Sequence, residues 1–201
     1  MFLGAERTKA LIIMANTSLN FDLSGCEGFS REQFWRHSLA TAGLARSITL
    51  LETRDAKFAD EAFTAGLLHD VGKLLLAANV TAPYSRTVSI AKSQRLTEWE
   101  AERMEFGTSH AELGACLLGT WGLPLRFLRA IAWHHAPLQS DDGQFSLLTA
   151  VHAANALDHG KNDGPDAGPL LKLDRHYLTR LGLAEHWIRW RELTGEKAAA
   201  A

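Results

Sequence analysis

A histidine and an aspartate stand side by side as His69 and Asp70, within the apolar stretch GLLHDVGKLLL. A neutral imidazole offers one nitrogen ligand, and a carboxylate offers two oxygens that can bridge two divalent ions. Four further histidines lie at the ends or on the apolar faces of neighbouring predicted helices: His37, His110, His134 and His135. One such histidine alone is usually a hydrogen-bonded core residue. Chance burial of five beside a carboxylate would be costly, so we expect a single metal site.

Asp70 is the predicted shared ligand of this site. Two-metal hydrolytic sites use a carboxylate between ions about 3.5–4 Å apart, and the nitrogen-rich set suits one or two divalent ions of Fe, Mn, Zn or Ni. Lys73 follows His69 by four residues on the same predicted helical face, where its ammonium could anchor a substrate phosphate. The alternative is a lysine at the rim whose stem covers apolar surface. We expect no role for the other histidines, which are His152, His159, His176 and His186.

The composition is that of a folded, soluble domain. The chain has 201 residues, of which 46% are hydrophobic and 22% charged, with a net charge of -2. No basic run suggests a nucleic-acid groove, no apolar run could span a bilayer, and the N-terminus lacks a usual secretory segment. Cys26 and Cys116 have no C-x-x-C spacing, which favours two free thiols and a cytoplasmic location.

Helical periodicity dominates the chain, and strand signals are nearly absent. We predict an all-α bundle with one domain over residues 1–195 and a frayed tail over 196–201. Gly66 and Gly72 flank the His-Asp pair. We expect each to allow close packing or the approach of an ion, and the alternative is that a glycine is simply tolerated there. Residues 159–169 are a predicted loop. The predicted helices cover 2–20, 31–53, 60–78, 83–94, 98–106, 110–120, 124–135, 145–157, a short segment capped by Asp174, and 184–193.

Five ordered blocks stand out along the chain, and they are FWRHSLATAGLAR, EAFTAGLLHDVGKLLL, LTEWEAERMEFGTSHAELGACLLGTWGLP, AIAWHHAP and LLTAVHAANAL. Together they resemble the HD superfamily of metal-dependent phosphohydrolases, and more specifically its HDOD branch of bacterial signalling proteins. The resemblance implies an HD-domain-like helical bundle. The chain starts close to a mid-domain helix of the family, here Leu3-Gly4, so it resembles a C-terminal portion, a shortened member or a product with a misplaced start. A second copy is expected to cover the remaining apolar surface as a homodimer.

The resemblance also implies a ligand set. The positions that match metal-binding residues of the family are His37, His69, Asp70, His110, His134 and His135. Gln33 stands where catalytic relatives with a GYP motif have a Glu, and Asn155 stands where the family has its last Asp ligand. The GYP motif itself is absent from HHAPLQSDDGQF.

These departures weaken one part of the implied site, because uncharged amide oxygens hold a hard cation less well than carboxylates. The part with His37, His69 and Asp70 is therefore compromised. The part that keeps its complete set contains Asp70, His110, His134 and His135. We expect one well-held divalent ion and a second that is weak or absent.

Three functions follow from the resemblance. The favoured one is a regulatory module that works with other signalling proteins, since GYP is missing and Gln33 and Asn155 are uncharged. The second is a metal-dependent phosphohydrolase acting on a nucleotide or cyclic dinucleotide, in which Asp70 and a metal would activate water and Lys73 would steady the phosphate. The third, a di-iron oxygenase, would need the complete ligand set.

Overall fold

The computed structural model describes residues 12, 14, 22–23, 25–162 and 173–195. Every regular element in these ranges is a helix, and none of the described residues forms a strand, which confirms the predicted all-α fold. Most of the predicted helix over 2–20 and the tail over 196–201 lie outside the described residues. The elements are α2 (Arg31–Thr53), α3 (Ala56–Leu68), α4 (Val71–Asn79), α5 (Thr81–Gln94), α6 (Glu98–Phe106), α7 (His110–Thr120), α8 (Leu125–Ala132), η1 (Pro137–Gln139), α9 (Leu147–Asn162), α10 (Arg175–Arg180) and α11 (His186–Glu192).

Side-chain caps fix the helix starts that matter for the site. The Ser30 hydroxyl accepts from the Gln33 N–H at the start of α2. Reciprocal capping boxes open α6, through Thr97 and Glu100, and α7, through Ser109 and Glu112. Helices α2, α6 and α7 begin and end at the predicted residues, and the α7 cap places His110 at its first position.

The predicted helix over 60–78 is wrong in two respects. Helix α3 begins earlier, at Ala56 after the Asp55 cap, and the chain breaks at the His-Asp pair. Helix α3 ends at Leu68, and α4 begins after Asp70, whose φ of -101° and ψ of 7° leave the helical path. Apolar periodicity continues across the break, so the pattern could not reveal it. Lys73 consequently does not share one continuous helix with His69, and instead lies three residues after Asp70 in the first turn of α4.

Close helix packing explains the two glycines beside the pair. A Cβ on Gly66 would lie 2.9 Å from the Cα of Ala42 on α2, and a Cβ on Gly72 would collide with the carbonyl oxygen of His110. Glycine removes these clashes and lets α3 approach α2 and α4 approach the start of α7. The predicted packing role of both residues is confirmed.

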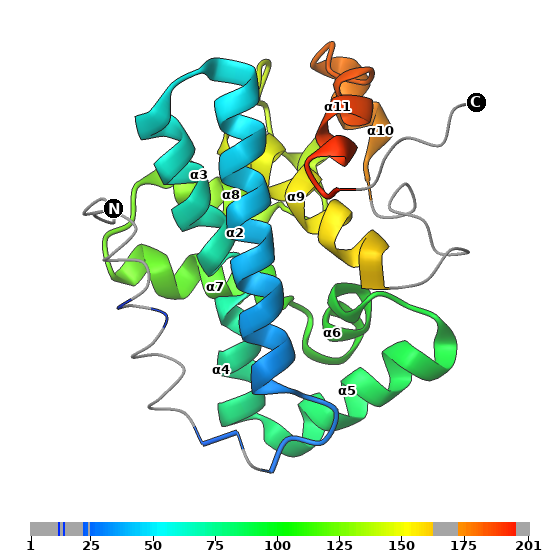
Figure 1. Cartoon of the computed structure of the whole chain (residues 1–201). Coiled ribbons are helices and arrows are strands. Elements are labelled where there is room, and N and C mark those ends of the chain that lie inside the picture. Colours follow the sequence, from blue (N-terminus) through cyan, green and yellow to red (C-terminus); the bar gives the residue numbers. More distant parts are fainter. Residues whose placement is uncertain (1–11, 13, 15–21, 24, 163–172, 196–201) are drawn as a thin grey trace.

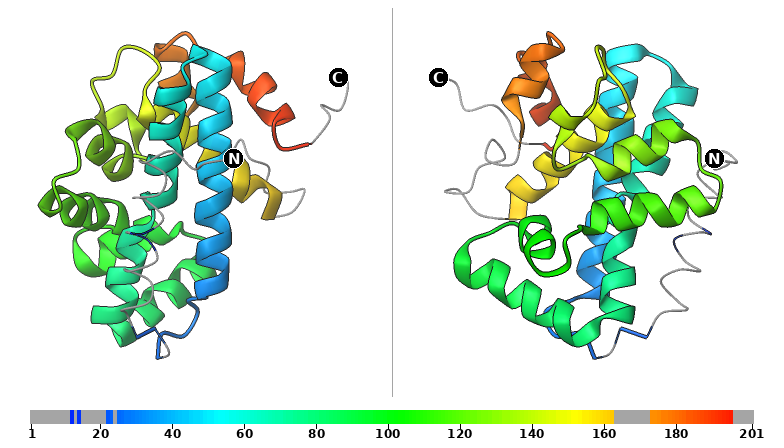
Figure 2. Two further views of the ribbon diagram at one scale, coloured as in Figure 1. Left: turned by 60° about the vertical axis from the view of Figure 1, so that its left-hand side comes forward. Right: turned by 180° about the vertical axis from the view of Figure 1, so that it is seen from behind.

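Helix α2 runs through the middle of the molecule and packs against α3 and α9 (Figure 1). Helix α7 packs against α4 and α8, and α8 packs against α9. Helices α10 and α11 lie near one end of α2, whereas α4 and α5 lie near the other, as both views of Figure 2 show. This arrangement brings the end of α3 and the starts of α4 and α7 to the same level of the bundle.

Several other helix limits differ from the prediction, including the starts of α5 and α9, which are at Thr81 and Leu147 rather than at residues 83 and 145. Helix α8 stops at Ala132, so His134 and His135 lie just beyond it rather than inside it. Helix α9 continues to Asn162, so His159 is on a helix and not in the predicted loop. Cys26 and Cys116 are both free thiols, as predicted. Among the helices of the described ranges, none has the length and apolar character needed to cross a membrane.

Candidate metal centre

The structure gathers the five predicted histidine ligands around Asp70, the sixth. They form two groups, and within each group one ligand atom per residue lies within 4.8 Å of the others. The four-ligand half comprises Asp70, His110, His134 and His135, and the three-ligand half comprises His37, His69 and Asp70. The residues come from α2, the α3–α4 junction, the start of α7 and the segment after α8.

The four-ligand half is compact and largely buried. The Nε2 atoms of His110 and His135 lie 3.1 Å apart. Asp70 Oδ1 lies 3.1 Å from His110 Nε2 and 3.7 Å from His134 Nε2. The side chains of His110 and His134 have no exposed surface, and that of Asp70 is 2% exposed. Oxygen and nitrogen ligands of one tetrahedral ion stand about 3.4 Å apart when each bond is about 2.1 Å, and the observed spacings match this value.

Outer partners fix the orientation of the histidine rings. Nδ1 of His69 donates to the carbonyl of Gly66, and Nδ1 of His134 donates to the carbonyl of Ile131, both at 2.7 Å. Since carbonyls only accept, the proton of each neutral ring is on Nδ1, and the Nε2 lone pair points inward. This is the usual outer support of a metal-bound histidine.

Carboxylates support two further rings in the same manner. Glu102 Oε2 lies 2.6 Å from His110 Nδ1, and Asp158 Oδ2 lies 2.7 Å from His37 Nδ1. The His110 backbone N–H also donates to Glu102 Oε2, at 2.7 Å. All four supported rings therefore aim Nε2 at the space around Asp70.

The donor set fits a divalent transition metal. His134 Nε2 is buried and has no hydrogen-bond partner among the described residues. His37 Nε2 and His69 Nε2 face each other at 3.2 Å, so a proton or another cation must separate their lone pairs. Buried, inward-facing imidazole nitrogens beside a carboxylate are the ligands that Fe, Mn, Zn or Ni ions take.

Burial and neighbouring charge set the protonation of the rings. Burial lowers the pKa of His69 to about 4, and it also lowers the pKa values of His134 and His135 well below the ordinary value. These three rings are therefore neutral near pH 7, as metal ligands must be. Burial opposes charge on His110 too, but Glu102 and Asp70 outweigh it and raise the pKa of His110 to about 9, so a metal ion would bind His110 with release of a proton.

Asp70 is anionic despite its burial. Burial alone would raise the pKa of its carboxyl, but His69, Lys73 and His110 hold that pKa well below its usual range. Burial alone would likewise lower the pKa of Lys73, yet Asp70 and Glu98 raise it well above its usual value. The site thus contains a charged carboxylate and a charged ammonium in direct contact.

Lys73 is more than a lysine whose stem covers apolar surface at the rim, because its ammonium pairs with two carboxylates. Its Nζ lies 2.9 Å from Asp70 Oδ2 and 2.9 Å from Glu98 Oε2, and its side chain is only 13% exposed. The Glu98 side chain is 42% exposed, so the ion pair lies at the mouth of the cluster. The ring of Trp99 stacks on that of His135, with centroids 5.9 Å apart.

The two predicted substitutions lie in different environments. Gln33 is exposed in the first turn of α2, one turn before His37. Asn155 is 4% exposed on α9, and its Oδ1 has no hydrogen-bond partner within the described part of the chain. A carboxylate that the sequence did not single out, Asp158, lies one turn further along α9 and contacts His37 instead.

Sequence reasoning missed the outer residues of the site. Glu102, Asp158 and Glu98 were not named, although Glu102 and Glu98 lie within the block that contains His110. The ring of His159 lies 4.7 Å from that of His37, whereas no role was expected for it. His152 has a structural contact, because its Nδ1 donates to the His134 carbonyl and its Nε2 accepts from the Asp174 N–H.

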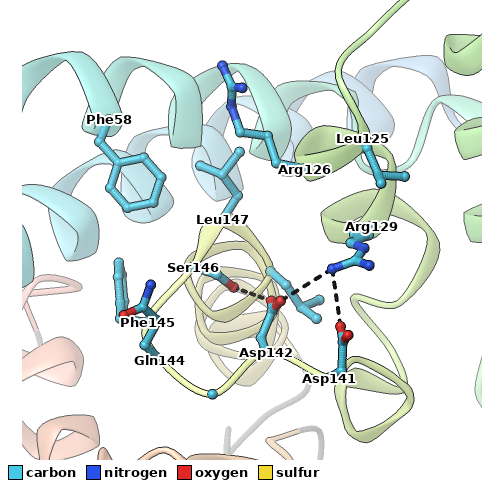
Figure 3. A pocket seen from close by; sticks show the side chains of 12 residues that line it. Phe58, Leu125, Arg126, Arg129, Asp141, Asp142, Gln144, Phe145, Ser146 and Leu147 are labelled. Carbon is cyan, nitrogen blue, oxygen red and sulfur yellow. Dashed lines mark hydrogen bonds and ion pairs between the residues drawn. The ribbon is translucent and has the colours of Figure 1, made fainter.

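A separate cavity of about 570 Å³ lies between α3, α8 and the start of α9 (Figure 3). Phe58, Arg126 and Arg129 are among its lining residues. Both arginines already have acidic partners, since Arg126 pairs with Glu61 and Arg129 pairs with Asp141. None of the six predicted ligands lines this cavity, so the metal cluster is a distinct feature of the bundle.

The chain is an all-α helical bundle with a buried His-Asp cluster that could hold a metal ion. The family model of the HDOD domain matches residues 1–137, and the chain belongs to this family. Among curated proteins, a search finds no match.

Solved structures of similar proteins agree with this assignment. An HDOD domain protein of unknown function from Geobacter sulfurreducens shares 25% identity with a TM-score of 0.67, over 98% of this chain and 64% of that one. The MmoQ response regulator from Methylococcus capsulatus str. Bath shares 30% identity with a TM-score of 0.57, over 83% of this chain and 63% of that one. A signal transduction candidate from Marinobacter aquaeolei VT8 has a TM-score of 0.65 at 20% identity, over 94% of this chain and 44% of that one, which shows the fold alone. The chain therefore spans less than two thirds of each of these three proteins.

Proposed function

We propose that this domain is a regulatory module of bacterial signal transduction that holds a divalent metal ion in its four-ligand half and is not an efficient phosphodiesterase. One observation carries the metal assignment: His110, His134 and Asp70 present ligand atoms to one buried point, and outer hydrogen bonds fix both rings. Membership of the HDOD family and the likeness to a response regulator support the signalling role.

A bound ion would connect parts of the chain that are far apart in sequence. Its ligands would come from the α3–α4 junction, the start of α7 and the segment after α8. Such an ion stabilises the bundle by mass action, since the unfolded chain has no preformed site. We propose that binding of the ion changes the relative positions of these helices, and with them the surface that a partner signalling protein contacts.

A phosphohydrolase acting on a nucleotide or cyclic dinucleotide is the second candidate, and Lys73 is the observation that favours it. Its ammonium is beside Asp70 and partly exposed, in reach of a phosphate at the mouth of the cluster. A bound divalent ion supplies a water of lowered pKa as nucleophile. Against this role, Lys73 already has two carboxylate partners, and Asn155 brings no charge to the three-ligand half.

The test compares the metal content and the turnover of the wild type with those of Asp70→Ala, with Asp141→Ala as the control because its side chain is 80% exposed. We expect close to one metal ion per chain after purification without added metal, and its loss only in Asp70→Ala. We expect phosphodiester and cyclic-dinucleotide turnover no faster than that of Asp70→Ala. Turnover that disappears in Asp70→Ala would favour the hydrolase, and metal-free wild type would overturn the metal assignment.

A further inference from the structure

The two oxygens of Asp70 have different neighbours. Oδ1 faces the four-ligand half, at 3.1 Å from His110 Nε2 and 3.7 Å from His134 Nε2. Oδ2 lies 3.7 Å from His37 Nε2, whereas the other histidine of the three-ligand half, His69, has its Nε2 3.4 Å from Oδ1. A carboxylate that bridges two ions gives one oxygen to each. With Oδ1 bound to the ion of the four-ligand half, a second ion in the three-ligand half would take Oδ2.

Oδ2 already has a cation. Lys73 Nζ lies 2.9 Å from Oδ2. The same ammonium lies 2.9 Å from Oε2 of Glu98, the first residue of α6. The lysine side chain is 13% exposed and begins in the first turn of α4, directly after Asp70. Moving the ammonium away would leave Asp70 with an unpaired oxygen and break both ion pairs.

An ammonium and a divalent ion on this oxygen would repel each other strongly. With bond lengths of about 2.1 Å for the metal, the two cations would lie at most about 5 Å apart in a region with little water. The other residues of the three-ligand half offer little compensation, since His37 and His69 are uncharged as ligands and Asn155 is a neutral amide.

We propose that the Lys73 ammonium, held by Asp70 and Glu98, takes the place that a second metal ion would need, so that the domain binds one divalent ion and not two. This inference rests on the proposed metal site in the four-ligand half. It assigns Lys73 a positioning role toward metal stoichiometry, with Glu98 as its second anchor.

The experiment is a titration of the chelator-treated full chain with Mn²⁺, read as ions per chain by equilibrium dialysis and as spin coupling by electron paramagnetic resonance. We expect one uncoupled Mn²⁺ in the wild type. Lys73→Met, which removes the charge, is expected to bind two ions with a coupled spectrum. Lys73→Arg, which keeps the charge, and Lys92→Met, a change at an exposed lysine, are expected to bind one.

Each outcome decides between the proposals. Two ions in the wild type would overturn the role of Lys73 while leaving the four-ligand site intact, and this measurement requires no variant. One ion in both the wild type and a folded Lys73→Met protein, or two ions in Lys73→Arg, would also overturn it. Lys73→Gln replaces Lys73→Met if circular dichroism shows that the latter is unfolded. No bound ion in the wild type would instead overturn the proposed function.

Discussion

The two halves of the cluster share Asp70 but differ in what supports them. In the four-ligand half, a fully buried carboxylate, Glu102, holds both the ring and the backbone of His110. In the three-ligand half, the acidic partner of His37 is Asp158, and the ring of His37 is partly exposed. Lys73 pairs with Oδ2, the Asp70 oxygen that lies 3.7 Å from His37. The same residue types are therefore supported by a buried carboxylate on one side and lie beside a lysine ammonium on the other.

The largest expected effect separates the halves by removing one ligand from each. His110→Ala should lower Mn²⁺ affinity by more than about 100-fold, because a direct ligand matters more than the outer partners, whose loss costs 10- to 100-fold. His37→Ala should leave the affinity of the first ion unchanged. Isothermal titration of both folded variants measures this, and equal losses would show that the ion binds across both halves.

A smaller effect is expected from the outer support of the four-ligand half. Glu102→Gln keeps the shape but removes the charge that orients His110, and it should weaken metal binding by about 10- to 100-fold. Glu105→Gln changes an exposed glutamate on the same helix and serves as the control. Unchanged affinity in Glu102→Gln would mean that the His110 ring needs no carboxylate behind it.

The metal-free protein should lose stability toward both acid and base, because burial lowers the pKa values of His69, His134 and His135 whereas Glu102 and Asp70 raise that of His110. The pKa of His69 is about 4 when folded, so the unfolded chain takes up the proton first, and stability falls as the pH drops from about 6.5 to 4. The pKa of His110 is about 9, so its contribution is complete below about pH 6.5 and is lost as the pH rises to 9. Melting temperatures across this range should therefore be highest near neutral pH.

Variants assign the two limbs of that profile. His69→Gln should make the acid limb shallower, with the remainder due to His134 and His135, and His110→Gln should flatten the alkaline limb. His176→Gln changes an exposed histidine and should leave the profile unaltered. An acid limb as steep in His69→Gln as in the wild type would assign it to other buried groups.

The smallest effect is expected from the outer partner of the three-ligand half. Asp158→Asn keeps an oxygen that can accept from His37, so metal binding should not change, and the free energy of unfolding should fall by about 1 kcal/mol. Chemical denaturation and metal titration of the same sample measure both quantities. A loss of metal affinity comparable to that of Glu102→Gln would remove the distinction between the halves.

Local sequence signals determined most helix limits. The caps at Ser30, Thr97 and Ser109 set where α2, α6 and α7 begin, because a cap depends only on residues three positions apart. The six residues that cluster in the bundle were also singled out from residue type and apolar context, and their role as metal ligands stays a prediction. The helix break at Asp70 was not predictable, because the apolar period continues through it while packing on α7 decides the backbone path.

Only the tertiary structure decided which outer residues support the histidine rings and which partners each oxygen of Asp70 contacts. Glu102 lies eight residues before His110, and Asp158 lies 121 residues after His37, so neither contact has a local pattern. Lys73 was visible in sequence as a charge near Asp70, but its second partner, Glu98, comes from another helix. Residue types are enough to suggest which side chains could bind a metal. The charge around each of them depends on which helices pack together, and helix packing is a property of the tertiary structure.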